Sequence, residues 1–551
     1  MTTSSFTRRT LLGAGLAAGA GLALSACTTG GETPGGVPSE NPASQAAAVR
    51  PNYIPFDGPK PDLLGDGATG VPNGFLSYHD PPPSTGRVPL NLSKPVEMHV
   101  QSIPSATPRD RNQWWKLLEK DLGNELSVVG TDSTQYKAKF QTLIAGNTLS
   151  EITQITSVPQ LPQVLEKLFT DLTPFLSGDN IKKYPNLANM PAAAWDMCMI
   201  GGKIWGLTNP RIVAGSVLMT RGDVLESKGI DLMPDLSDGQ DFLDLCKELT
   251  DKSKGVFAIG QVPQNWTVPL ILESLGAPNG WSVDASGNWT SAYEDPTYEK
   301  ALEIVTQMWK DGVIHPNSYT DLSSTAVWFT GGATNMFAQN FASWMSYASG
   351  AITNANTDSG SFPVGAVVMP KWDGGGKAAK HLGVPGYADI VGIKKMDDEA
   401  RIDELLRVGD YLASPFGTQE YLNLWYGVKG RQYNLAKGQI ELIADRPNES
   451  ISGPSYFGGM SAVSLYAPNK EDVGRRLFQY AQDMIPTGTK NPSYGKFSDT
   501  LVSKGATAAV KLNDLMAGII QGRNKLTEWA AGVKTWKEEA GDAIAREYAA
   551  Q

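Results

Sequence analysis

The sequence predicts an α/β protein built from layers of strands and helices. From residue 96 onward, short segments of alternating apolar residues, typical of strands, are separated by longer segments with apolar residues at helical spacing. The chain also has 551 residues, of which 41% are hydrophobic and 19% are charged, so it is long enough to form large cores in two to three domains.

The first regular elements are expected directly after residue 95. The stretch PVEMHVQSI alternates apolar and polar residues and predicts a strand over 96–103. The next stretch, RDRNQWWKLLEKDLG, predicts a helix because Trp114, Leu117 and Leu118 fall on one face.

Three later helices carry signals for their ends or for the face they bury. In SDGQDFLDLCKELT, Ser237 and Gln240 have the spacing of a capping box. In DPTYEKALEIVTQMWKDG, Asp295 is the expected cap, Pro296 the first helical residue and Gly312 the stop. Near the C-terminus, apolar residues recur at helical spacing and predict a helix that docks its aromatic face on the body: Leu526, Trp529, Val533 and Trp536.

The N-terminus has the composition of an export signal over residues 1–26. It contains Arg8 and Arg9, no acidic residue and an apolar run from residue 11 to residue 26. TRRTLL resembles the twin-arginine class, and LSAC resembles a bacterial lipobox, which implies that Cys27 carries lipid. We therefore expect an exported protein anchored by lipid to the outer face of the cell membrane. A plain secretory signal with an incidental cysteine, or an uncut anchor, is the alternative.

The next two segments differ from the body in composition. Residues 27–50 are rich in Gly, Pro, Ser and Thr without a period and predict a flexible tether. Residues 51–95 keep many Pro and Gly but add NYIPF and GFLSYH, so we expect an arm that wraps on the body.

Charge and cysteine usage exclude several classes of partner. The net charge is −10 and the basic residues are scattered, so no nucleic-acid partner is expected. Cys198 and Cys246 have apolar neighbours typical of buried free thiols, although export would permit a disulfide. No metal-ligand spacing links them to the four histidines, so neither a metal nor a cofactor is expected.

Signatures of catalysis are missing as well. The chain has no G-x-S-x-G elbow, no phosphate loop ending in G-K-[ST] and no H-E-x-x-H helix, so we do not expect an enzyme. A pair of carboxylates for glycoside cleavage depends on the fold and stays an alternative.

Aromatic residues in polar, turn-like settings indicate a different kind of site. An aromatic plane beside amides and carboxylates matches both the apolar face and the hydroxyl rim of a sugar. Such settings surround Trp266, Trp344, Tyr347, Tyr387 and Trp425. For each residue taken singly, core packing is an equally good interpretation.

Four stretches of the chain resemble the extracellular solute-binding lipoproteins of bacterial ABC importers, in their carbohydrate-binding group. The stretches are GGKIWGLTNP, RGDVLESKGID with LSDGQDFLDLCKEL, LLRVGDYLASPFGTQEYLNLWYGVKGRQYNL, and MAGIIQGRNKLTEWAAGVKTWKEEAGDAIAREY. The resemblance implies a two-lobe α/β fold, like that of periplasmic binding proteins, with hinged lobes of discontinuous chain. Lobe 1 is expected to comprise 96–208, 325–385 and the C-terminal helices 506–551; lobe 2 is expected to comprise 209–324 and 386–505.

The resemblance also implies a ligand between the lobes and an import partner. The candidate ligand-binding residues are Gln101, Arg211, Trp266, Asn340, Trp344, Tyr387, Asp389, Trp425 and Arg431. Trp266 and Trp344 are the expected stacking platforms, and Asp389 and Arg431 the expected partners of hydroxyls. We expect a monomer that binds a carbohydrate, specifically an oligosaccharide because the lobes are large, and passes it to ABC permease subunits. A surface-anchored glycoside-active enzyme, a binder of peptides or other solutes, and a structural lipoprotein are the alternatives.

Overall fold

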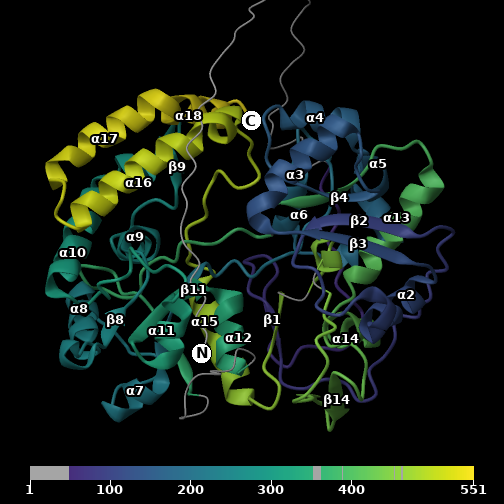
Figure 1. Ribbon diagram of the computed structural model, residues 1–551, viewed down its shortest axis with the longest axis horizontal. Coiled ribbons are helices and arrows are strands. Elements are labelled where there is room, and N and C mark those ends of the chain that lie inside the picture. Colours follow the sequence, from purple (N-terminus) through teal and green to yellow (C-terminus); the bar gives the residue numbers. More distant parts are fainter. Residues whose placement is uncertain (1–48, 351–361, 387–388, 452, 461–462) are drawn as a thin grey trace, which may run out of the picture. The chain divides into compact units, whose positions relative to one another are not determined.

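The computed structural model describes residues 49–350, 362–386, 389–451, 453–460 and 463–551. All of them belong to one compact unit of the chain, and Figure 1 shows its elements. The predicted export signal, Cys27, most of the predicted tether and Tyr387 lie outside the described residues.

The first sheet has four strands in the order β13-β4-β2-β3. The strands are β2 (Val96–Gln101), β3 (Leu126–Thr131), β4 (Ile152–Ile155) and β13 (Ile390–Ile393). β2 pairs in parallel with β3 and β4, whereas β13 runs antiparallel to β4. The strand predicted over 96–103 is thus confirmed, with its end at Gln101.

Helices pack around this sheet and bury a first core with it. They are α2 (Gln113–Leu122), α3 (Ser133–Gly146), α4 (Leu161–Leu168), α5 (Thr173–Leu176), α6 (Ala192–Cys198) and α13 (Glu399–Leu412). The first core includes Met98, Phe140, Phe169, Leu207 and Leu405. The predicted helix α2 is confirmed: the Asn112 side chain accepts from the Trp115 N–H at its start, and Gly123 ends it in the left-handed conformation.

The second sheet also has four strands, in the order β12-β7-β11-β8. These are β7 (Ser216–Arg221), β8 (Phe257–Ile259), β11 (Thr334–Asn340) and β12 (Val364–Val367). Successive residues of β7 alternate between two cores, with Leu218 in a second core and Val217 and Met219 in a third. This alternation is the period of two that a strand buried on both faces requires.

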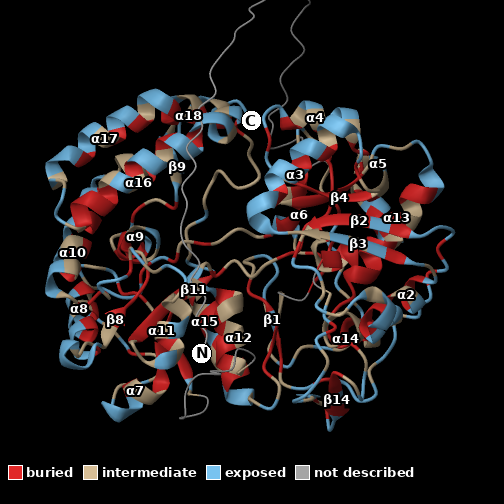
Figure 2. Cartoon of the chain, in the orientation of Figure 1, coloured by how far each residue is buried: buried red, intermediate tan, exposed pale blue. Residues whose placement is uncertain are grey.

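Helices cover both faces of the second sheet. The second core lies with α8 (Gly239–Glu248), α9 (Pro263–Ser274), α10 (Pro296–Asp311), α16 (Ala506–Ile520), α17 (Trp529–Trp536) and α18 (Asp542–Ala549). The third core lies with α11 (Thr325–Gly331), α12 (Phe341–Ser349) and α15 (Glu471–Met484). Figure 2 shows the buried stripes of these helices in red.

Two of these helices test the predicted end signals. Asp295 caps α10, Pro296 is its first residue and Gly312 ends it with φ of 66°, all as predicted. For α8 the predicted capping box is wrong, because Asp238 is the cap and its carboxylate accepts from the N–H groups of Gln240 and Asp241. A carboxylate one residue closer to the helix reaches the free donors directly, and its charge suits the positive end of the helix dipole.

The predicted assignment of segments to lobes needs correction. β11 and β12, expected in lobe 1, pair with β7 of the second sheet, and β13, expected in lobe 2, pairs with β4 of the first sheet. The C-terminal helices do dock their aromatic face, with Trp529 and Trp536 buried, but against α9 and α10 instead of on lobe 1 (Figure 1). Apolar periodicity predicts that a segment is a strand; the partner it pairs with depends on contacts distant in sequence.

The arm is ordered on the body, as expected. Its strand β1 (Asn73–Phe75) pairs in parallel with β16 (Ser464–Tyr466). Beside this pair lies a fourth, aromatic core of Phe75, Tyr78, Phe416, Tyr421, Leu422, Tyr433, Leu435, Ile440 and Tyr466. Its members come partly from α14 (Gln419–Trp425) and from the hairpin of β14 (Tyr433–Ala436) and β15 (Gln439–Leu442).

Two short hairpins and two free cysteines are further features of the described residues. The hairpins are β5 (Met199–Ile200) with β6 (Lys203–Ile204), and β9 (Trp281–Val283) with β10 (Trp289–Ser291). Cys198 and Cys246 are both buried and unpaired, so the free-thiol interpretation is confirmed and the disulfide alternative is wrong.

Candidate functional site

Two predicted ligand residues meet at the carboxyl edge of the first sheet. Gln101 ends β2, and Asp389 directly precedes β13, whose first residue Ile390 lies opposite Ile155 at the end of β4. Because β13 runs antiparallel to its neighbour, its start and the ends of β2 and β4 share one edge of the sheet. In open α/β sheets this is the edge where ligands bind.

Gln154 joins the two residues. Its side-chain oxygen accepts from the Gln101 backbone N–H at 2.8 Å, and its amide nitrogen donates to Asp389 Oδ2 at 3.0 Å. Gln154 is wholly buried and its backbone carbonyl accepts from the Tyr136 hydroxyl at 2.7 Å. A buried amide that is bonded through both its oxygen and its nitrogen holds its neighbours in one geometry, so Gln154 fixes the position of Asp389.

The environment of Asp389 favours its neutral form more than water does. Burial raises the pKa of the Asp389 carboxyl, while hydrogen bonds from Gln154 and Thr156 and the charge of Lys137 act in the opposite direction. The residue as a whole is half-buried. A partly desolvated acceptor of this kind binds hydroxyl donors well, because fewer water molecules compete with the ligand hydroxyl for the carboxyl oxygens.

His99 adds a second polar group at this sheet that was missed from the sequence. It lies in β2, is 4% exposed, and its Nε2 is 2.9 Å from Thr131 Oγ1 at the end of β3. Burial, assisted by the charge of Lys139, lowers the pKa of the imidazole and thereby favours its neutral form. A polar residue in the middle of an apolar strand, as in EMHVQ and ITQI, was the available signal for both His99 and Gln154.

The second sheet has a comparable edge that holds Trp266 and Asn340. β8 and β11 are parallel, and Gln261, just past β8, exchanges two hydrogen bonds with the backbone of Ala338 at 2.8 and 2.6 Å. Trp266 follows in the first turn of α9 and is half-buried against the second core. Asn340 ends β11, is exposed, and caps α12 by accepting from the Ser343 N–H at 2.9 Å. These two residues therefore present an indole and an amide at one edge.

Arg211 lies on one of the crossovers between the two sheets. Bridges pair Leu207 with Val391 and Pro210 with Gly386, and the Arg211 N–H donates to the Pro385 carbonyl at 2.9 Å. The segments of Arg211 and Asp389 are therefore paired with each other, although the residues are far apart in sequence. Because Arg211 lies on a crossover, its position depends on how both sheets are arranged.

Trp344 is a correction to the predicted site. Its side chain is fully buried in the third core, 5.5 Å from the Phe341 ring and 5.0 Å from the Tyr480 ring between centroids. With no exposed face, it cannot serve as a stacking platform in this conformation. Trp344 lies on the face of α12 that is turned toward α15, and a sequence does not state which helix will cover which face.

Trp425 and Arg431 have their own packing and ion-pair partners. Trp425 ends α14 and packs half-buried against the fourth core, 6.2 Å from the Tyr421 ring. Arg431 forms a two-point ion pair with the buried Glu449, with distances of 2.9 and 2.7 Å. This pairing occupies one N–H edge of the guanidinium, so it leaves fewer donors for a hydroxyl partner.

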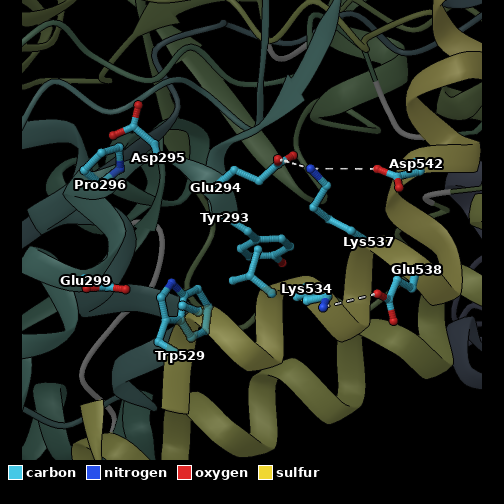
Figure 3. A pocket seen from close by; sticks show the side chains of 12 residues that line it. Tyr293, Glu294, Asp295, Pro296, Glu299, Trp529, Lys534, Lys537, Glu538 and Asp542 are labelled. Atoms are coloured by element: carbon cyan, nitrogen blue, oxygen red, sulfur yellow. Dashed lines mark hydrogen bonds and ion pairs between the residues drawn. The ribbon is translucent and has the colours of Figure 1, made fainter. Parts of the chain in front are cut away.

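A cavity of about 570 Å³ lies elsewhere, between the start of α10 and the helix α17 (Figure 3). Its lysines are paired with its own carboxylates: Lys537 Nζ lies 2.5 Å from Glu294 and 3.9 Å from Asp542, and Lys534 Nζ lies 4.0 Å from Glu538. A second cavity of about 420 Å³ is lined by Lys203 and Trp205, among others. Neither cavity contains a predicted ligand residue. In the first cavity the charged side chains pair with one another, as is common on protein surfaces without a ligand.

Within the described ranges, no group of three or more His, Cys, Asp or Glu residues is arranged to hold a metal ion. Among the helices in those ranges, none has the length and apolar character to cross a membrane.

Comparison with known proteins identifies a family and a relative that are similar to this chain. The sequence profile of the family described as bacterial extracellular solute-binding protein matches residues 113–425, more than half of the chain. Lipoprotein LipO of Bacillus subtilis is 24% identical over 475 residues, which cover 82% of this chain and 91% of LipO.

Solved structures share the fold. The N-glycan transport solute-binding protein NgtS of Streptococcus pneumoniae superposes with a TM-score of 0.60 at 14% identity, over 83% of this chain and 98% of NgtS. The alginate-binding protein AlgQ2 superposes with a TM-score of 0.59 at 13% identity, over 83% of this chain and 99% of AlgQ2. The predicted α/β fold of solute-binding proteins is thereby confirmed. The chain belongs to the family of bacterial extracellular solute-binding proteins.

Proposed function

We propose that this protein captures an oligosaccharide outside the cell and delivers it to an ABC import permease, while a lipid on Cys27 anchors it to the membrane. The observation that carries the proposal is the bonded group Gln101–Gln154–Asp389 at the carboxyl edge of the first sheet. It holds a partly desolvated carboxylate in a fixed position, as recognition of hydroxyl groups requires.

Three further features support a sugar as the ligand. Trp266 and Asn340 supply an indole and an amide at the edge of the second sheet, and Arg211 lies on the crossover. The structures of similar fold include an alginate-binding protein and an N-glycan transport protein. A sugar held between the two edges would stabilise whichever arrangement of the sheets brings them together, because a ligand favours the state it binds more tightly.

Calorimetric titration with a panel of neutral and acidic oligosaccharides tests the ligand class. A ligand at 100 times its dissociation constant should also raise the free energy of unfolding by about 2.7 kcal/mol. Analysis of the sugar after each titration separates binding from cleavage: intact sugar supports a binding protein, and shortened products would show a glycoside-active enzyme instead.

The Asp389→Asn variant tests the site. Removing the charged acceptor should weaken binding of the best sugar at least about tenfold, which corresponds to about 1.4 kcal/mol. Asp397→Asn is the matched control, because Asp397 follows the other end of β13 and is exposed. Equal affinities of the two variants would remove Asp389 from the site.

The anchor and the transport partner need cellular assays. Cys27→Ala should move the protein from the membrane fraction to the medium and abolish its labelling by a fatty acid. Cells that lack the protein should lose uptake of the sugar found by titration, and uptake that continues unchanged would contradict delivery to a permease.

A further inference from the structure

The arm starts and ends on the first core but leaves it in between. At its start, the N–H of Asn52 donates to the Gly178 carbonyl at 3.1 Å, and the N–H of Ile54 donates to the Ala188 carbonyl at 2.8 Å. At its end, Leu90 and Leu92 are buried in the first core, directly before β2.

The middle of the arm packs on elements of the second sheet. Val71 is 6% exposed and belongs to the third core, and Leu63 packs against the same core. β1 then pairs with β16, register Gly74 opposite Leu465, and contacts α15. Leu465 also belongs to the third core, whereas Met460, five residues earlier, belongs to the first. β1 is therefore attached where the chain passes from the first core to the third.

The fourth core joins the arm to both sides of this crossover. The Phe75 ring stacks on Phe416 at 4.3 Å, and Phe416 lies 5.1 Å from Tyr466 of β16. Tyr78 contacts both Phe416 and Tyr466 and donates its hydroxyl to the Thr418 carbonyl at 2.6 Å. Aromatic packing of this density makes small rotations between its members costly.

Buried carboxylates hold the returning part of the arm. Glu420, 1% exposed, accepts from the Ser84 hydroxyl at 2.6 Å, from the Thr85 hydroxyl at 3.0 Å and from the Thr85 N–H at 3.0 and 3.1 Å. Arg87 lies 3.4 Å from the buried Asp410 of α13. The arm supplies hydrogen-bond or charge partners to both carboxylates, so its detachment would remove these stabilising contacts.

From these contacts we infer that the arm, residues 51–95, acts as a brace on the crossover and limits rotation of the two sheets with respect to each other. The three contact regions that carry the inference are β1 on β16, the fourth core, and the carboxylates that hold the return. The inference rests on the proposed function only in taking rotation of the sheets as the motion that accompanies binding. Its consequence is that the arm sets how often the unliganded protein leaves its preferred arrangement.

Distances between two spin labels in the absence of any sugar test the brace. Lys116 on α2 and Lys310 on α10 are exposed, so cysteines there place one label over each sheet. The full chain with Cys27→Ser is the background, since Cys198 and Cys246 are buried and will not take up label in the folded protein. Pulsed electron paramagnetic resonance then gives the distribution of distances.

Two variants loosen the brace to different extents. Phe75→Ala removes the ring shared by the arm and the fourth core, and should raise the population of alternative distances at least about tenfold. Tyr78→Phe removes only the hydrogen bond to Thr418 and should raise it about threefold, which keeps the test available if Phe75→Ala fails to fold. Ile54→Ala is the matched control, since this arm residue packs against the first core alone, and its distribution should equal that of the unmodified protein.

The outcomes decide the inference independently of the ligand. Broader distributions for Phe75→Ala and Tyr78→Phe, with Ile54→Ala unchanged, support the brace. Distributions that coincide for all folded variants would overturn it and reduce the arm to surface packing. The distances are measured without sugar, so a failure to find a bound sugar would not change them. The proposed function can therefore be refuted while the brace is supported, and the reverse.

Discussion

Replacing Asp410 with asparagine should remove a loss of stability that the protein suffers as the pH rises. Asp410 lies in α13 and its side chain is only 5% exposed. Its Oδ1 accepts from the N–H groups of Asn186 at 2.8 Å and Leu187 at 3.1 Å, and its Oδ2 lies 3.4 Å from Arg87. An asparagine oxygen can keep the two backbone bonds without carrying a charge.

The magnitude follows from the proton affinity of the carboxyl. Burial raises the pKa of Asp410 from 3.8 to about 6, against the hydrogen bonds from Asn186 and Leu187 and the charge of Arg87. The folded protein thus holds the proton more tightly than the unfolded chain. Its stability is greatest below the unfolded pKa and falls as the pH rises through about 6. A difference of about two pKa units corresponds to about 3 kcal/mol.

Urea unfolding at a series of pH values measures this effect. Between pH 4 and pH 7, the free energy of unfolding of Asp410→Asn minus that of the unmodified protein should rise by about 2 kcal/mol, because part of the effect lies below pH 4. Other titrating groups contribute equally to both proteins, so they cancel in this difference.

Asp403 on the same helix supplies a control of opposite sign. Hydrogen bonds from Lys183 and Tyr184 outweigh burial and lower the pKa of Asp403. Asp403→Asn should therefore lose stability, relative to the unmodified protein, as the pH rises toward 4, and the difference should change little above that pH. If the Asp410→Asn difference stays flat or falls between pH 4 and pH 7, the reasoning about burial is refuted.

Three further predictions concern the cores. Trp344→Ala should lower the free energy of unfolding by about 3 to 5 kcal/mol in urea titrations, because Trp344 is wholly buried; a near-neutral result would return it to the candidate site. Cys198 and Cys246 should not react with a thiol reagent until the protein is unfolded, and rapid reaction of the native protein would contradict their burial. Lys380→Met should destabilise by about 3 to 5 kcal/mol because it strands the buried Glu273, 3.1 Å away, and adding Glu273→Leu should recover most of that loss; no recovery would mean that the pair is not coupled.

Sequence alone determined features whose causes are local. The helix α10 is an example, since Asp295, Pro296 and Gly312 specify its ends through backbone chemistry within a few residues. The strand beginning at Val96 and the buried thiols of Cys198 and Cys246 likewise follow from neighbouring residues. The family was also recognisable from stretches of the sequence, and its profile matches residues 113–425.

The tertiary structure decided which segments meet. β11 and β13 are both strands, but only long-range pairing placed β11 in the second sheet and β13 in the first. Gln101 and Asp389 were predicted separately, whereas Gln154, which connects them, gave little signal beyond a polar residue within ITQI. Trp266 and Trp344 looked alike in sequence, and one lies at an edge while the other lies in a core. Local propensity describes each segment by itself, whereas burial and pairing depend on residues hundreds of positions away, and those contacts exist only once the chain has folded.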